Sequence, residues 1–128
     1  MGMKVTERQV RDVTILDISG RITLGDGTAL LRDTTRGLIS QGKKNLLLNL
    51  GQVPHMDSSG IAELVSAFTA ARREGGDVKL LNLTKRVRDT VEIVKLGGIF
   101  ELFDDEAAAL RSFANKQDEE PDSLARAG

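Results

Sequence analysis

The sequence predicts an α/β fold, in which a mixed β-sheet of about four to five strands carries about four helices. Three observations lead to this prediction. Short runs of β-branched and aliphatic residues alternate along the chain with longer segments of helical periodicity. The first two runs, residues 3–10 and 13–18, are close enough in the chain to pair as a hairpin. The later runs are largely apolar, which is typical of strands buried on both faces of a parallel sheet.

The first half of the chain reads as the hairpin, a helix and an interior strand. Residues 13–18 are rich in β-branched side chains and form the stronger strand of the hairpin. Asp26 or Thr28 then caps a helix that extends to about Ser40, because their side-chain oxygens accept hydrogen bonds from free helical amides. Residues 45–50, Asn-Leu-Leu-Leu-Asn-Leu, are short and apolar enough for a strand with both faces covered.

The second half repeats the alternation of helix and strand. Residues 58–74 carry apolar side chains at helical spacing, and a glycine pair follows them. Residues 78–83 are the next interior strand, and Thr84 caps the helix after it. Residues 99–103 are expected to be a short strand or an extended segment. The acidic residues 104–106 mark the start of a last helix, where the helix dipole favours negative charge.

A single domain is predicted over residues 1–114, because this length is typical of one domain with its own core. Residues 115–128 lose the apolar periodicity and contain a cluster of carboxylates. Such a composition cannot bury enough apolar surface to fold by itself. We therefore expect residues 115–128 to form a disordered acidic tail.

The composition excludes several classes of function. The formal net charge is −1, and aromatic residues make up 3% of the chain, so neither a basic field nor a stacking surface is present for nucleic acid. Cysteine is absent and there is one histidine, which argues against thiolate or histidine metal sites. No apolar run approaches the roughly 20 residues of a membrane span, and the N-terminus lacks the apolar stretch of a signal peptide. We expect a cytoplasmic protein that has no cofactor. We also expect that it binds neither nucleic acid nor a membrane.

The one arrangement that resembles a hydrolase site is the cluster of His55, Asp57 and Ser58. Neighbouring residues on one short segment point in different directions, whereas catalytic triads are assembled from separate elements. The chain also lacks the Gly-x-Ser-x-Gly sequence of a nucleophile elbow. We interpret His55 as a surface loop residue and expect that the protein is not an enzyme.

The segment that joins residues 45–50 to the following helix carries the functional signal. Asp57, Ser58 and Ser59 are all good helix caps, and one of them would suffice for capping. A helix N-terminus also favours phosphate, because free amides and the helix dipole attract an anion. Gly60 is expected to permit the close approach of a partner's backbone. The residue types therefore fit a binding surface that a phosphate on serine switches.

The motif Asp57-Ser58-Ser59-Gly60-Ile61, preceded by residues 45–50, resembles the signature of STAS domains. The resemblance covers about residues 4–114 and is strongest to the bacterial anti-sigma-factor antagonists of sporulation and stress signalling. It implies that Ser58 is the phosphorylation site. It also implies that the kinase is the anti-sigma factor itself, a serine kinase of the histidine-kinase-like ATPase fold. The unphosphorylated protein would bind this kinase and free a sigma factor, and a metal-dependent serine phosphatase would reset the switch.

The same resemblance implies a partner-binding surface at residues 57–61 and in the loop after the second strand, where Arg21 and Thr23 stand. Many members have an acidic residue at the position of Arg21. An alternative within the family is a non-phosphorylated adaptor subunit of a stressosome or of a lipid- or anion-transport complex. In either case we expect a monomer or a weak dimer.

Overall fold

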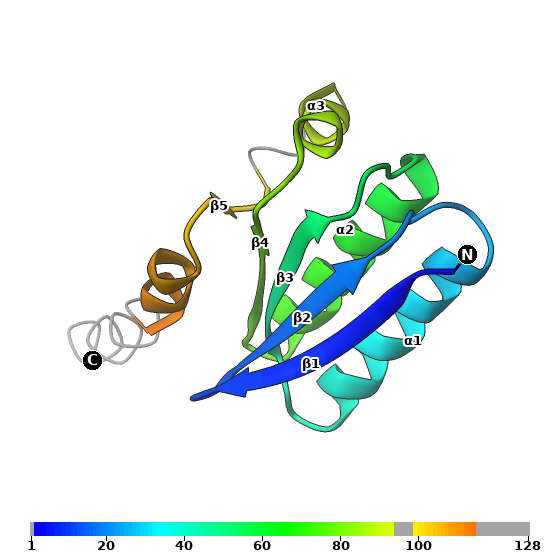
Figure 1. The fold of residues 1–128 in the computed structure, drawn as a ribbon. Coiled ribbons are helices and arrows are strands. Elements are labelled where there is room, and N and C mark those ends of the chain that lie inside the picture. The colour runs from blue at the N-terminus through cyan, green and yellow to red at the C-terminus, as the bar shows by residue number, and fades with distance from the viewer. Residues whose placement is uncertain (1, 94–98, 115–128) are drawn as a thin grey trace, which may run out of the picture.

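Five strands form one mixed sheet in the computed structural model, which describes residues 2–93 and 99–114 (Figure 1). The order in the sheet is the order in the chain, β1-β2-β3-β4-β5. β1 and β2 are an antiparallel hairpin, and the pairs from β2 to β5 are parallel. The strands are β1 (Lys4–Val10), β2 (Val13–Ser19), β3 (Asn45–Gln52), β4 (Asp77–Leu81) and β5 (Leu102–Phe103). The predicted mixed sheet with an initial hairpin is confirmed.

Helices lie on both faces of the sheet, as Figure 1 shows. α1 (Asp26–Ser40) and α2 (Ser58–Arg73) cover one face side by side. α3 (Lys85–Ile93) follows β4, and a helical segment over residues 106–114 covers part of the other face. The described residues thus contain the four helices that the sequence predicts.

The core consists of two aliphatic layers that the alternation of side chains along the strands produces. On β2 and β3, Leu16 and Leu48 belong to the larger cluster beneath α1 and α2. Ile15 and Leu47 point the other way and pack with Ala109 of the C-terminal helical segment and its neighbours. Because both faces of β3 are covered, its central residues are fully buried, as the apolar run predicts.

A buried lysine connects β4 to the C-terminal helical segment. The side chain of Lys79 is on β4, and the residue is 1% exposed. Its Nζ lies 3.1 Å from a carboxylate oxygen of Glu101 and donates to Ser112 Oγ at 2.8 Å. The same ammonium lies 4.7 Å from the ring centroid of Phe113, a cation–π contact. The ammonium group of Lys79 therefore has three favourable contacts. The aliphatic part of the side chain packs under the C-terminal helical segment.

Several boundaries differ from the sequence predictions. α1 begins after Gly25, and Thr28, one of the two predicted caps, exchanges hydrogen bonds with Gly25 N at 3.3 Å and Gly25 O at 3.1 Å. β4 ends at Leu81, two residues before the predicted end, because Asn82 takes a left-handed conformation with φ 59°. The extended segment before the last helix pairs with β4 over two residues only. The predicted tail, residues 115–128, lies outside the described residues, so its disorder stays a prediction.

Candidate functional site

The start of α2 lies just after the carboxyl end of β3, and Asp57 is its N-terminal cap. Asp57 Oδ1 accepts hydrogen bonds from Ser59 N at 3.0 Å and from Gly60 N at 3.2 Å, and also from the Ser59 hydroxyl. These two amides are among those that lack partners within a helix. The Asp57 carboxylate therefore satisfies two of the amides at the helix start, and the Ser59 hydroxyl holds it in place.

The loop after β2 meets the start of α2. Ile22 N donates to His55 O at 3.1 Å, and Asp57 N donates to Ile22 O at 3.2 Å, so the two segments pair like short parallel strands. Two residues further on, Leu24 N donates to Asp57 Oδ2 at 3.1 Å. One carboxylate thus holds the first turn of α2 with one oxygen and the β2–α1 loop with the other.

These contacts also act on the charge of Asp57. Its pKa is lowered from the ordinary aspartate value, first by the hydrogen bond from the Ser59 hydroxyl and then by the backbone amides of Leu24, Gly60 and Ser59. Hydrogen bonds to the ionised form stabilise it. The site therefore carries a negative charge at neutral pH before any modification.

Ser58 occupies the first position of α2 and is exposed. Among the described residues its hydroxyl has no hydrogen-bond partner, in contrast to the hydroxyl of Ser59. Capping of α2 consequently does not use the Ser58 side chain. A helix-cap role, which the sequence left open for all three residues, belongs to Asp57 with support from Ser59.

Gly60 and Ile61 lie in the interior, and the expectation that Gly60 gives room to a partner's backbone is wrong. A Cβ on Gly60 would stand 2.8 Å from the carbonyl oxygen of Ile22 and 2.6 Å from Met56 Cγ. The chain's own β2–α1 loop is what approaches this glycine. Ile61 is 5% exposed and belongs to the core beneath α1 and α2. Both residues therefore support the site from below, and little of either residue is exposed.

The β2–α1 loop adds an exposed apolar side chain that the sequence interpretation missed. Leu24 is 80% exposed, although its amide is fixed to Asp57. Arg21 is exposed and Thr23 is half-buried, and both line a shallow hollow of about 290 Å³ together with Leu24. The available signal was a leucine isolated between Thr23 and Gly25 in a predicted loop. Arg21, Thr23, Leu24 and Ser58 are hereafter called the loop–helix surface.

The structure gives no support to a hydrolase or a metal site. His55 is half-buried in place of the expected surface position, and its Nδ1 is enclosed without a hydrogen-bond partner among the described residues. No hydrogen bond connects it to Asp57 or Ser58 there. In residues 2–93 and 99–114, no group of three or more His, Asp or Glu side chains could hold a metal ion. Within the same ranges, none of the helices is long and apolar enough to cross a bilayer.

Comparisons with known proteins identify the fold and a named relative. The anti-sigma-B factor antagonist of Bacillus subtilis (strain 168) is 29% identical over 102 residues, which cover 80% of this chain and 92% of that protein. A crystal structure of a Thermotoga maritima protein has a TM-score of 0.81 at 19% identity and covers 86% of this chain and 94% of its own. The Bacillus cell fate determinant SpoIIAA in its phosphorylated form has a TM-score of 0.67 at 20% identity, over 85% of this chain and 99% of that one.

The sequence model of the STAS domain matches residues 4–109, from the first strand of the sheet into the helical segment that covers its far face. This match includes the hairpin, all of the parallel strands and the complete loop–helix surface. It spans most of the 128 residues. The chain belongs to the STAS domain family.

Proposed function

We propose that this protein is an anti-sigma-factor antagonist whose binding is switched by phosphorylation of Ser58. In its unphosphorylated form it binds an anti-sigma factor, which is a serine kinase of the histidine-kinase-like ATPase fold, and so frees a sigma factor. The relative named as an anti-sigma-B factor antagonist supports this proposal, because the similarity covers nearly the whole of that protein. The geometry at the start of α2 supports the switch.

The observation that carries the proposal is the separation of roles between two adjacent serines. The Ser59 hydroxyl is engaged by Asp57, whereas the Ser58 hydroxyl is exposed and has no partner in the described part of the chain. A kinase can reach such a hydroxyl without unfolding the helix. Its modification also leaves the cap made by Asp57 in place, so the fold survives both states.

The effect of a phosphate follows from its charge. Phosphoserine adds roughly −1.5 to −2 charges and three strong acceptor oxygens. The new charge stands on the residue after the ionised Asp57, whose carboxylate also holds the amide of the exposed Leu24. A partner that covers Leu24 would have to exclude water from this dianion. Losing about 2.7 kcal/mol weakens binding 100-fold, and a buried charge without a counterion readily costs that much.

The loop–helix surface is the proposed docking site. Leu24 supplies an apolar anchor, Arg21 supplies a positive charge, and Ser58, which follows the Asp57 that holds the loop, is the switch. Asp57 and Gly60 hold the two segments together from below. A metal-dependent serine phosphatase that removes the phosphate would return the protein to its binding form.

The test is affinity capture from the native host with wild type, Ser58→Ala and Ser58→Asp as baits. Wild type and Ser58→Ala should retain an ATPase-fold serine kinase, and Ser58→Asp should lose it. The purified kinase and ATP should then phosphorylate the wild type on Ser58, as phosphopeptide mapping would show, and leave Ser58→Ala unmodified.

Thr69→Asp is the matched control, because Thr69 is an exposed α2 residue outside the loop–helix surface. It adds the same charge to the same helix and should keep the kinase bound. If all four baits capture the same transport or scaffold subunits instead, the protein is an adaptor and the switch is refuted.

A further inference from the structure

A groove separates the last turns of α1 and α2, far from the loop–helix surface. It has a volume of about 400 Å³ and is lined by Arg36, Ile39 and Ser40 of α1, Ala70 and Arg73 of α2, and Glu74. This volume falls in the range of sites for small ligands. Ser58 and Arg73 are the first and last residues of α2, so the groove lies about 22 Å along the helix from Ser58.

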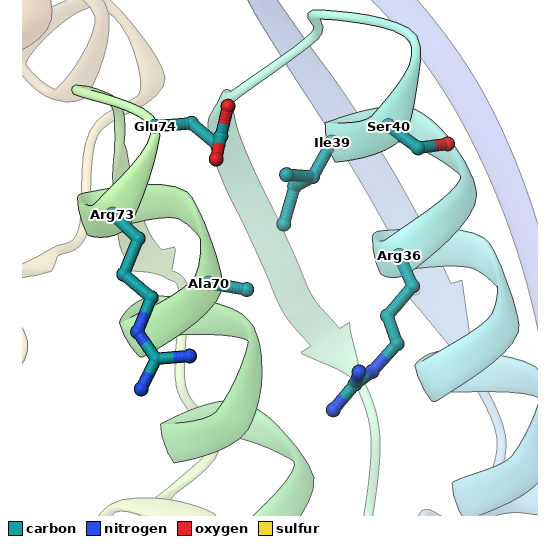
Figure 2. Close-up of a pocket in the computed structure, with 6 residues that line it drawn as sticks. All are labelled: Arg36, Ile39, Ser40, Ala70, Arg73 and Glu74. Carbon is teal, nitrogen blue, oxygen red and sulfur yellow. The ribbon is translucent and has the colours of Figure 1, made fainter.

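The charged groups of the groove are divided between its two ends. Figure 2 shows the guanidinium groups of Arg36 and Arg73 at one end, since both side chains point back toward the N-termini of their helices. The Glu74 carboxylate lies at the other end, where both helices terminate. The apolar side chains of Ile39 and Ala70 lie between these ends and face each other across the groove. A positively charged end and a negatively charged end thus flank an apolar middle.

None of the three charges in this groove has an ionic partner among the described residues. Arg36 donates to a neutral acceptor, Ser66 Oγ, at 2.9 Å. By contrast, the neighbouring arginines of both helices are paired: Arg32 with Glu63 at 3.7 Å, and Arg72 with Asp77 at 3.5 Å. Within the described residues, the charged side chains of the groove are therefore without an ionic partner, whereas Arg32 and Arg72 beside it have one.

The C-terminal ends of both helices lie at the end of the groove that carries Glu74. The carbonyl groups at the C-termini of α1 and α2 give this end of the groove a partial negative potential, which the Lys44 ammonium already meets at α2. Lys44 fixes the rim, because its Nζ donates to the Glu74 carbonyl oxygen at 2.7 Å. The walls are thus helical, and the groove is present in the structure without a ligand.

We propose that this groove binds a small zwitterion, an ω-amino carboxylate with a short aliphatic body. Its carboxylate pairs with Arg36 and Arg73, since guanidinium groups suit planar carboxylates. Its ammonium group pairs with Glu74, and its methylene groups lie on Ile39 and Ala70. A ligand with a single charge satisfies one end of the groove and leaves the other unpaired.

The test is a methyl NMR titration of the full chain labelled at isoleucine and alanine. The probe is 4-aminobutanoate, and the comparison ligands are butanoate and butylamine, all at constant ionic strength. The Ile39 and Ala70 methyl signals should shift saturably with 4-aminobutanoate, at least tenfold more tightly than with either singly charged ligand. Glycine, which has one methylene between its charges, should bind more weakly than 4-aminobutanoate.

Variants decide whether the charged residues are responsible. Arg36→Gln combined with Arg73→Gln should raise the dissociation constant at least tenfold, while core methyl signals stay in place. Arg32→Gln is the control, because Arg32 is on α1 but pairs with Glu63 outside the groove. Ser58→Asp should bind the probe like wild type, so this result is independent of the phosphorylation switch. Equal binding of butanoate or butylamine, or shifts that never saturate, would overturn the proposal.

Discussion

The carboxylate of Asp57 accepts a hydrogen bond from the backbone amide of Leu24 at 3.1 Å, across 33 positions of the sequence. The same side chain caps α2 through its other oxygen. The exposed leucine and the helix that begins with Ser58 are therefore held in one fixed arrangement. Both parts of the loop–helix surface depend on this single half-buried residue.

Replacing Asp57 with Asn should separate these two roles. An asparagine side chain has one carbonyl oxygen, which can still accept from the amides of α2, because Asn is as good a cap as Asp. Its NH₂ group would then face Leu24 N, and two donors cannot bond to each other. Hydrogen exchange measured by NMR should show a faster Leu24 amide and unchanged Ser59 and Gly60 amides. Faster exchange at all three amides would contradict this separation. It would show that the negative charge, which asparagine lacks, holds both the loop and the helix start.

Leu24→Ala should weaken partner binding without destabilising the fold. The side chain is 80% exposed, so its removal should change the free energy of unfolding by less than about 0.5 kcal/mol. An apolar anchor at the centre of an interface contributes about 2 kcal/mol or more, which is over tenfold in affinity. Calorimetric titration with the captured kinase measures this loss. Ile99→Ala, at an aliphatic residue that is 41% exposed and outside the loop–helix surface, should bind like wild type.

Gly60→Ala should destabilise the protein, whereas Gly37→Ala should stabilise it. The new methyl group at position 60 would collide with the Ile22 carbonyl oxygen, and backbone cannot move aside as a side chain can. Such overpacking costs about 1–3 kcal/mol. Gly37 is also in a helix but has nothing within 4 Å of its Cβ position, so alanine there should gain about 0.5–1 kcal/mol. Urea unfolding of both variants checks the opposite signs.

Stability should fall in acid through two aspartates. The pKa of Asp17 is lowered first by its hydrogen bond from Arg8 and then by Asn49, and the pKa of Asp57 is lowered by the contacts at the start of α2. Folded-state pKa values below the unfolded ones give stability that is present above the unfolded value of about 4 and is lost as the pH falls through the folded values.

Asp17→Asn and Asp57→Asn should each reduce this loss when urea midpoints are compared from about pH 6 to about pH 3. Asp33→Asn, on the exposed side of α1, is the control and should follow the wild-type curve. A variant curve parallel to the wild type for either Asp17 or Asp57 would remove that residue from the explanation.

Lys79→Met should be tolerated far better than Lys79→Ala. Methionine keeps the length that packs against Phe113, and Glu101 remains hydrated because its side chain is 57% exposed. Ser112 Oγ keeps its bond to the Ala109 carbonyl oxygen. The methionine variant should lie within about 1.5 kcal/mol of wild type, and the alanine variant should lose about 2–5 kcal/mol through a cavity. Equal losses in urea unfolding would show that the charge contacts matter more than the stem.

The sheet was predictable because its signals are local. Residues 45–50 include three consecutive leucines, which indicates a strand that is covered on both faces. The hairpin strands are separated only by Arg11 and Asp12. Helix limits followed from caps and glycines, whose preferences act over one turn. The resemblance of residues 57–61 to the STAS signature then located the candidate site.

What the sequence could not provide is the pairing of Ile22 with Met56, because it joins segments far apart in the chain. That contact explains why Gly60 is small, and a glycine alone does not show whether a partner or the chain itself approaches it. It also brings the amide of Leu24 to the carboxylate of Asp57. An exposed leucine in a loop has no sequence pattern of its own, so only its neighbours in space identify it.

The order of the sheet has a consequence for how the protein is made. Each strand neighbours the strand that precedes it in the chain, so a nascent chain can add strands one by one as it leaves the ribosome. The far face is different, because Ala109 and Phe113, which cover Ile15 and Leu47, come late in the sequence. During synthesis that face stays exposed to water and to other chains until the C-terminal helical segment emerges. We therefore expect that chains terminated before this segment aggregate.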